Sequence, residues 1–307
     1  MTLPVTFLPT GKTVRVPCGT SLLQAAVQAG LLIDTPCGGS GTCGKCRMRI
    51  RAGEVSAGGS SQHLTAEQLE AGWRLACVTR VTGPLEVEVP GTSLLARLDT
   101  ILVNGAPVSI RRDPHRLGDM GVAFDLGTTT VAGTLFDLHT GLERASHAVM
   151  NRQVRMGDDV ISRIHAVRQD PSTLTQLQTA AIETLNEILD ALCDACGETS
   201  GTVRRVTVAG NTAMQQLLLG IDPSPLGEAP FTAAFTDAQT TGAARLGLKV
   251  AANAMLTVFP QIGGFVGGDT VAGLLASRFD TLTHPALLVD IGTNGEIALF
   301  TGNALLV

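Results

Sequence analysis

Four unevenly spaced cysteines constrain this 307-residue chain more than any other feature of its sequence. Cys37, Cys43 and Cys46 lie in one glycine-rich stretch, whereas Cys77 stands alone farther along the chain. Three close ligands and one distant ligand are typical of an iron-sulfur cluster, while structural zinc usually takes two close pairs. The intervening glycines let backbone N–H groups approach cluster sulfurs without a Cβ in the way. The spacing therefore predicts a 2Fe-2S cluster held by these four cysteines, with zinc as the alternative.

Composition excludes several classes of function. A net charge of -5 and a pI near 5.7 provide no basic surface for phosphate backbones, so we expect no nucleic acid partner. Apolar runs such as residues 286–289 are far shorter than the roughly 18 residues of a membrane span. The first residues lack the basic and apolar regions of a secretory signal, which predicts a cytoplasmic chain with reduced thiols.

The first 90 residues follow a strand, strand, helix, ligand loop and strand pattern. Short extended runs surround Thr10–Lys12, and Ser21 stands three residues before Gln24, the spacing of a capping box at a helix start. Residues 46–51 and 85–89 alternate between apolar and polar, as half-buried strands do. Together with the cysteines, this order resembles the β-grasp 2Fe-2S ferredoxin domain, and the five-residue gap after Cys37 is similar to adrenodoxin-like and activator-type proteins.

Residues 91–118 break periodicity and are expected to be a linker, with Thr100–Val103 as a short strand or helix within it. After the linker, two similar motifs stand 165 positions apart. Asp125–Thr130 and Asp290–Glu296 each follow an apolar strand with Asp, Gly and hydroxyl or amide residues, which indicates an internal duplication. Glycine lets backbone N–H groups approach phosphate oxygens, and aspartates hold hydrated magnesium.

These paired hairpins resemble the phosphate-1 and phosphate-2 loops of the actin, sugar-kinase and heat-shock-chaperone ATPase superfamily. The resemblance implies an α/β, ribonuclease H-like domain over residues 119–307 that binds ATP with Mg²⁺. Asn211 follows an apolar strand, at the end where α/β clefts open. Asp269 precedes a helical run and is a candidate catalytic base, with a plain helix N-cap as the alternative. The expected nucleotide-binding residues are Asp125, Gly127, Thr128, Thr129, Thr130, Asn211, Asp290, Gly292, Thr293 and Asn294.

Three further cysteines lie outside the cluster spacing. Cys193 and Cys196 fall on the apolar side of a long amphipathic helix predicted from the spacing of apolar residues between 174 and 196. Core packing explains both, and their role is otherwise open. Cys18 is expected to be a small buried side chain.

Both halves together resemble the reductive activators of corrinoid proteins. The predicted fold is an α+β β-grasp ferredoxin domain followed by an incomplete α/β actin-like ATPase domain, because the chain stops just after the second phosphate hairpin. The resemblance implies ATP-coupled reduction of a Co(II) corrinoid on a methyl-transfer partner to Co(I), with electrons from an external low-potential donor. A homodimer is left open.

Two alternatives remain. One is a simple 2Fe-2S electron carrier with a non-hydrolysing binding domain. The other is an activator of a 2-hydroxyacyl-CoA dehydratase, which would carry a 4Fe-4S cluster between subunits.

Overall fold

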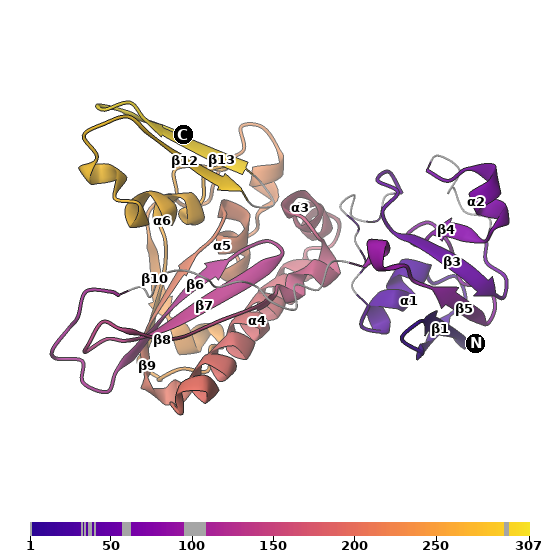
Figure 1. Ribbon diagram of the computed structural model, residues 1–307, viewed down its shortest axis with the longest axis horizontal. Coiled ribbons are helices and arrows are strands. Elements are labelled where there is room, and N and C mark those ends of the chain that lie inside the picture. Colours follow the sequence, from indigo (N-terminus) through magenta and orange to yellow (C-terminus); the bar gives the residue numbers. More distant parts are fainter. Residues whose placement is uncertain are drawn as a thin grey trace. The chain divides into compact units, whose positions relative to one another are not determined.

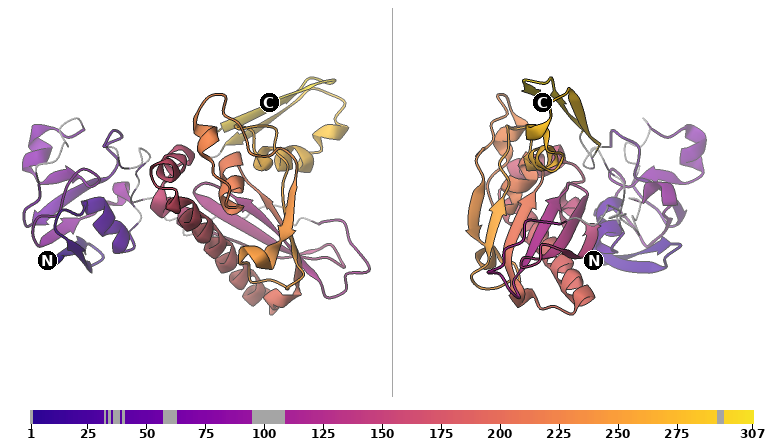
Figure 2. Two further views of the ribbon diagram at one scale, coloured as in Figure 1. Left: turned by 180° about the vertical axis from the view of Figure 1, so that it is seen from behind. Right: turned by 60° about the vertical axis from the view of Figure 1, so that its left-hand side comes forward.

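The structure, a computed structural model, describes residues 2–31, 33, 35, 39, 41–56, 63–94, 109–291 and 295–307, without the side chains of residues 280 and 291. The chain divides into two compact units, Met1–Asp99 and Thr100–Val307 (Figures 1 and 2). Each unit has its own hydrophobic core.

The first unit is built on a mixed five-stranded sheet. Its elements are β1 (Thr2–Leu8), β2 (Lys12–Pro17), α1 (Leu22–Gln28), β3 (Arg47–Ala52), α2 (Ala66–Glu70), β4 (Trp73–Leu75), β5 (Leu85–Glu88) and the 3-10 turn η2 (Gly91–Ser93). The strand order is β2-β1-β5-β3-β4, with β1 parallel to β5 and the other pairs antiparallel. Helix α1 shares one core with this sheet. The β-grasp fold predicted from the sequence is confirmed.

Helix α1 begins and ends where the sequence indicates. The Ser21 side chain accepts a hydrogen bond from the Gln24 backbone N–H, and the Gln24 side chain accepts one from Ser21, so the capping box is formed. Gly30 adopts φ +70° just after the helix, a conformation that favours glycine. The expectation for Cys18 is wrong, because its side chain is exposed in the turn after β2.

The second unit contains a six-stranded sheet in the order β10-β11-β9-β6-β7-β8. Its strands are β6 (Met120–Leu126), β7 (Thr130–Asp137), β8 (Glu143–Met150), β9 (Val203–Ala209), β10 (Gln239–Gly242) and β11 (Met255–Val258). Strands β6, β7 and β8 form an antiparallel meander, whereas β9 and β11 run parallel to β6 after helical crossovers. This arrangement confirms the predicted ribonuclease H-like α/β fold.

Helices and 3-10 turns accompany these strands. They are η3 (Arg152–Met156), α3 (Val160–Gln169), α4 (Ser172–Cys196), η4 (Ser200–Thr202), α5 (Thr212–Leu218), η5 (Ser224–Gly227), η6 (Ala243–Leu246), α6 (Gly268–Ala276) and η7 (Phe279–Thr281). Helix α4, the predicted amphipathic helix, runs along the sheet face formed by β7 and β8 (Figure 1). Leu177, Leu185 and Ile188 are fully buried there. Cys193 is buried and Cys196 half-buried on the same helix.

A second hairpin follows α6. Strands β12 (Ala286–Ile291), β13 (Gly295–Phe300) and β14 (Leu305–Leu306) form a three-stranded antiparallel sheet. Leu274 of α6 and Ala298 of β13 belong to the small core of this region. The β12–β13 hairpin thus has the form of the β6–β7 hairpin, with an aspartate near the end of the first strand in both.

The end of the expected linker segment belongs to the second unit and is hydrogen-bonded to the turn between β7 and β8. The N–H of Ile110 donates to the Gly141 carbonyl and that of Asp113 to the Leu138 carbonyl, both at 2.8 Å. Thr100–Val103 lies outside the described residues. Of the helices that the structure describes, none is both long and apolar enough to cross a membrane.

Close packing of β7 on α4 predicts that Gly133→Ala will destabilise the second unit by about 1–3 kcal/mol. An added Cβ would lie 2.7 Å from Ile188 Cγ2 and 2.8 Å from Phe124 Cε1. The control is Gly201→Ala, whose Cβ would meet Thr199 Oγ1 at an ordinary 3.9 Å. Urea unfolding followed by circular dichroism should show a lower midpoint for Gly133→Ala alone, and equal midpoints would contradict the packing.

Candidate cluster and phosphate sites

Strand pairing brings two of the four predicted cluster ligands together. Cys46 directly precedes β3 and Cys77 follows β4, the antiparallel neighbour of β3. The Ala76 N–H donates to the Cys46 carbonyl at 2.9 Å, which locks the two segments in register. Both thiols are buried, and their Sγ atoms lie 3.3 Å apart. Cys43 is half-buried in the preceding loop, and Cys37 lies outside the described residues.

The loop around these thiols fits an iron-sulfur cluster. Gly39, Gly41 and Gly44 adopt φ values of +83°, +82° and +68°. A Cβ added at Gly39 would lie 3.7 Å from the Cβ of Cys77, so side chains here would fill the space beside that ligand. Thiolates are the ligands that such clusters take, and glycine leaves backbone N–H groups free to approach their sulfurs.

The arginines of β3 have partners within the first unit. Arg47 Nε donates to the Gly44 carbonyl at 2.9 Å, which holds the turn between Cys43 and Cys46. Arg49 Nε donates to the Ala71 carbonyl at 2.9 Å. Arg47 therefore stabilises the cluster loop, and Arg49 stabilises the segment that precedes β4.

The tip of the β6–β7 hairpin forms the first candidate phosphate loop. Gly127 makes the turn possible, because an added Cβ would lie 2.3 Å from the Thr130 carbonyl oxygen. Thr128 is buried, and its Oγ1 accepts a hydrogen bond from Asn211 Nδ2 at 2.9 Å. Asn211 also caps α5 through the N–H of Met214. The structure thus joins two predicted site residues that lie 83 positions apart.

Glycines bring the start of α6 against this loop. A Cβ at Gly267 would lie 2.5 Å from Asn211 Cα, and one at Gly210 would lie 2.7 Å from the Leu126 carbonyl oxygen. The Asp269 N–H donates to the Gly210 carbonyl at 3.2 Å. Gly267 is the N-cap of α6 and Asp269 lies in its first turn, so the simple N-cap explanation for Asp269 is wrong.

Acidic side chains from three elements interact in this region. Partial burial, followed by the charges of Asp269 and Asp290, raises the pKa of Asp125 to about 6. Burial and the charge of Asp290 likewise raise the pKa of Asp269, against the opposing effect of a hydrogen bond from the Thr270 N–H. The structure therefore brings together the carboxylates of Asp125, Asp269 and Asp290.

Glu296 is a member of this acidic region that sequence reasoning did not select. Its pKa is raised by burial, then by Asp269 and Asp290. Glu296 stands opposite Asp290 in the β12–β13 register. The hairpin predicted at this position in the sequence implies that pairing, so Glu296 could have been selected from it. Gly292, Thr293 and Asn294, between these two residues, lie outside the described residues.

A cavity of about 490 Å³ adjoins the site. Asn211 and Glu296 lie on its polar wall, while Ile161, Ile164 and Phe265 contribute apolar surface. Among the described residues no group of three His, Cys, Asp or Glu side chains is arranged to ligate a metal ion directly. The acidic side chains can instead attract a cation that keeps its own water ligands, as magnesium usually does.

Two family models match the chain. A 2Fe-2S iron-sulfur cluster binding domain matches residues 5–82, and the RACo middle region matches residues 120–282. The corrinoid activation enzyme RamQ of Eubacterium limosum is 37% identical over 179 residues, which are 58% of this chain and 30% of RamQ. A component of the Na(+)-translocating NADH-quinone reductase of Actinobacillus succinogenes is 33% identical over 84 residues, 26% of this chain and 20% of that protein.

One solved structure resembles the chain along nearly its whole length. A reductive activator for corrinoid, iron-sulfur protein is similar over 99% of this chain and 62% of its own, with a TM-score of 0.60 and 28% identity. The chain therefore spans less than two thirds of the length of these relatives.

The raised pKa of Asp125 predicts a pH-dependent effect of Asp125→Asn. Because the folded-state pKa of about 6 exceeds the ordinary value of 3.8, the ionised carboxyl costs stability above pH 6, and this cost vanishes below about pH 4. Allowing for solvent screening, we expect the variant to melt about 2–4 °C higher at pH 8, equivalent to about 1 kcal/mol. The gain should shrink as the pH falls from 6 to 4.

Calorimetry in chelator-containing buffer measures this effect, with the exposed Asp237→Asn as the control. A gain that is the same at every pH would contradict the raised pKa of Asp125.

Proposed function

Because this chain belongs to the family defined by the RACo middle region and carries a 2Fe-2S cluster binding domain before it, we propose that it reactivates a corrinoid protein by reduction. One electron passes to the Co(II) corrinoid of a methyl-transfer partner and gives Co(I), coupled to ATP. The main support is the presence, in one chain, of a buried thiol pair and of interacting acidic side chains beside a glycine-rich hairpin tip. The similarity to RamQ, a corrinoid activation enzyme, adds to it.

In this proposal Cys37, Cys43, Cys46 and Cys77 hold the cluster. When bound, the cluster supplies single electrons at the low potential, about -400 mV, that is typical of plant-type ferredoxins. The protein contributes a buried position for Cys46 and Cys77 and a turn fixed by Arg47. Burial and hydrogen bonding of the ligands are the means by which a protein adjusts such a potential.

The second unit binds ATP with Mg²⁺ in this proposal. Asp125 and Asp290 hold the hydrated cation, and Asp269 orients and deprotonates the attacking water. The raised pKa of Asp269 supports a role as base, because proton transfer is most effective when the pKa lies nearer the working pH. The phosphate-contacting residues in the proposal are Gly127, Thr128, Thr129, Thr130, Asn211, Gly292, Thr293 and Asn294.

The proposal also includes a cellular location, an electron donor and a protein partner. The chain works in the cytoplasm and receives electrons from a separate low-potential donor. Its acidic net charge favours a protein partner over nucleic acid. A homodimer is compatible with this scheme.

Iron analysis tests the cluster assignment. The anaerobically reconstituted chain should contain about two irons and two sulfides. Cys46→Ser and Cys77→Ser should lose the visible absorption of the cluster, because each removes a buried ligand. Cys18→Ser should keep it, since Cys18 is exposed and outside the ligand spacing. Four irons shared by two chains would instead support the dehydratase-activator alternative.

Cobalt spectroscopy tests the activity. The reduced chain is mixed anaerobically with Co(II) corrinoid proteins, with and without Mg-ATP, and Co(I) is followed by absorbance. We expect Co(I) to form faster with ATP, and Asp125→Ala and Asp290→Ala to abolish this stimulation while leaving the cluster spectrum unchanged. Asp237→Ala is the control.

A rate independent of ATP would support the simple electron carrier with a non-hydrolysing domain. Failure to form Co(I) with any corrinoid partner would contradict the proposed function.

A further inference from the structure

Arg163 of α3 is fully buried, although it carries a charge. Burial lowers its pKa to about 10, against the opposing charges of Asp158 and Asp159, so the guanidinium remains protonated at neutral pH. An isolated buried charge would cost several kcal/mol, and hydrogen bonds must compensate for it. The role of Arg163 therefore extends beyond occupying volume in the core.

The guanidinium reaches four acceptors on three different segments. Nε donates to the Gly157 carbonyl at 2.8 Å, and Nη1 donates to Gln153 Oε1 at 3.1 Å and to Met214 Sδ at 2.8 Å. Nη2 donates to the Thr128 carbonyl at 2.5 Å. Arg163 therefore connects the hairpin tip, η3 and α5 from behind the proposed phosphate site.

Asn151 holds the carbonyls on either side of Thr128. Its Nδ2 donates to the Gly127 carbonyl at 2.8 Å, and its backbone N–H donates to the Thr129 carbonyl at 2.8 Å. Asn151 is itself buried, and its Nδ2 also donates to Gln153 Oε1 at 3.1 Å, the atom that Arg163 contacts. Three consecutive carbonyls of the tip thus accept hydrogen bonds from one buried network.

Peptide geometry determines which way the N–H groups of the hairpin tip point. The peptide bonds of the tip are trans, and in a planar trans peptide the carbonyl of one residue and the N–H of the next point to opposite sides. Carbonyls 127, 128 and 129 point toward Arg163 and Asn151. The N–H groups of Thr128, Thr129 and Thr130 therefore point to the other side of the tip. Successive N–H groups facing one side form an anion-binding concavity.

We propose that Arg163 and Asn151 are positioning residues that fix the carbonyls of the β6–β7 tip and thereby aim its N–H groups at the polyphosphate of the nucleotide. This inference rests on the proposed nucleotide site and names the residues that shape it. Asn211 completes the network, because it caps the helix that carries Met214 and also donates to Thr128 Oγ1. Neither Arg163 nor Asn151 touches the phosphate.

The test is binding of Mg-ATP and of Mg-tripolyphosphate to the full chain, measured by titration calorimetry. Arg163→Met and Asn151→Leu should weaken both ligands about tenfold to hundredfold, the effect expected from misdirecting hydrogen bonds to a charged group. Arg163→Lys should also weaken them, because a single ammonium cannot span the four acceptors. Hydrogen exchange of residues 127–130 should rise in these variants while exchange in α4 stays unchanged.

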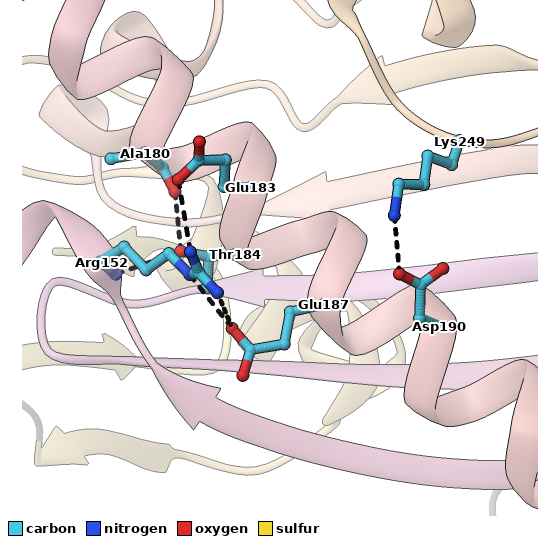
Figure 3. Close-up of polar contacts among 7 residues, drawn as sticks. All are labelled: Arg152, Ala180, Glu183, Thr184, Glu187, Asp190 and Lys249. Carbon is cyan, nitrogen blue, oxygen red and sulfur yellow. Dashed lines mark hydrogen bonds and ion pairs between the residues drawn. The ribbon is translucent and has the colours of Figure 1, made fainter.

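Two controls separate positioning from general stability. Arg152→Met removes a neighbouring arginine whose guanidinium binds Glu187 at 2.9 Å and Glu183 at 3.4 Å on α4 instead of the tip (Figure 3). Leu192→Ala empties a fully buried position of α4 and lowers the melting temperature without removing a tip contact. Both should retain wild-type affinity at temperatures where they are folded.

The outcomes distinguish this inference from the proposed function. Wild-type affinity in Arg163→Met and Asn151→Leu, or an equal loss in Leu192→Ala, would overturn the positioning role and leave the nucleotide site standing. If Arg163→Met does not fold, wild-type affinity in Arg163→Lys and Asn151→Leu would overturn the positioning role instead. Absence of binding to the unaltered chain would instead overturn the nucleotide site itself, and the positioning role with it.

Discussion

Three carboxylates gathered in a partly desolvated space are the constraint on which the candidate phosphate site depends. Burial and then the charges of Asp269 of α6 and Asp290 of β12 raise the pKa of Asp125 of β6, and burial and then the charge of Asp290 raise the pKa of Asp269. Helix α6 can approach so closely because glycine stands at position 267, where an added Cβ would lie 2.5 Å from Asn211 Cα. A bound divalent cation would relieve this repulsion, and it would also draw the negatively charged phosphates of a nucleotide to the hairpin tip. The acidic side chains and the polar tip therefore suit the same ligand.

In the proposed function, the two units meet different requirements of a low-potential electron transfer. In the first unit, buried thiols on a sheet suit a cluster that must exchange electrons without rearranging its ligands. Energy is a separate problem, since each 100 mV of uphill one-electron transfer costs about 2.3 kcal/mol. A deficit of a few hundred millivolts exceeds the roughly 1–3 kcal/mol of typical allosteric coupling. Binding alone would rarely supply that energy, whereas nucleotide hydrolysis could.

Helices were predicted from local patterns and distant site residues from paired motifs, whereas contacts without a motif gave no signal in the sequence. The capping box at Ser21 and the apolar spacing of residues 174–196 predicted α1 and α4, because helix starts and faces are set by neighbours a few positions away. The network behind the hairpin tip gave no such signal, since Arg163 and Asn151 bind carbonyls 35 and 24 positions distant. Exposure of Cys18 depends on the path of the chain after β2, which no local pattern decides. Glu296 could have been found, because opposite residues of an antiparallel hairpin face the same side.

A single-turnover experiment is the sharpest test of the proposal that ATP permits one electron to pass from this chain to a corrinoid. The chain, reduced by one electron, is mixed with one equivalent of Co(II) corrinoid protein, and samples frozen at intervals are examined by electron paramagnetic resonance. The reduced cluster and Co(II) each carry an unpaired electron, whereas the oxidised cluster and Co(I) give no signal. The proposed ATP coupling predicts that both signals vanish together, at one rate, and far faster with Mg-ATP than without it. Equal rates with and without nucleotide, or loss of the Co(II) signal while the cluster signal remains, would contradict it.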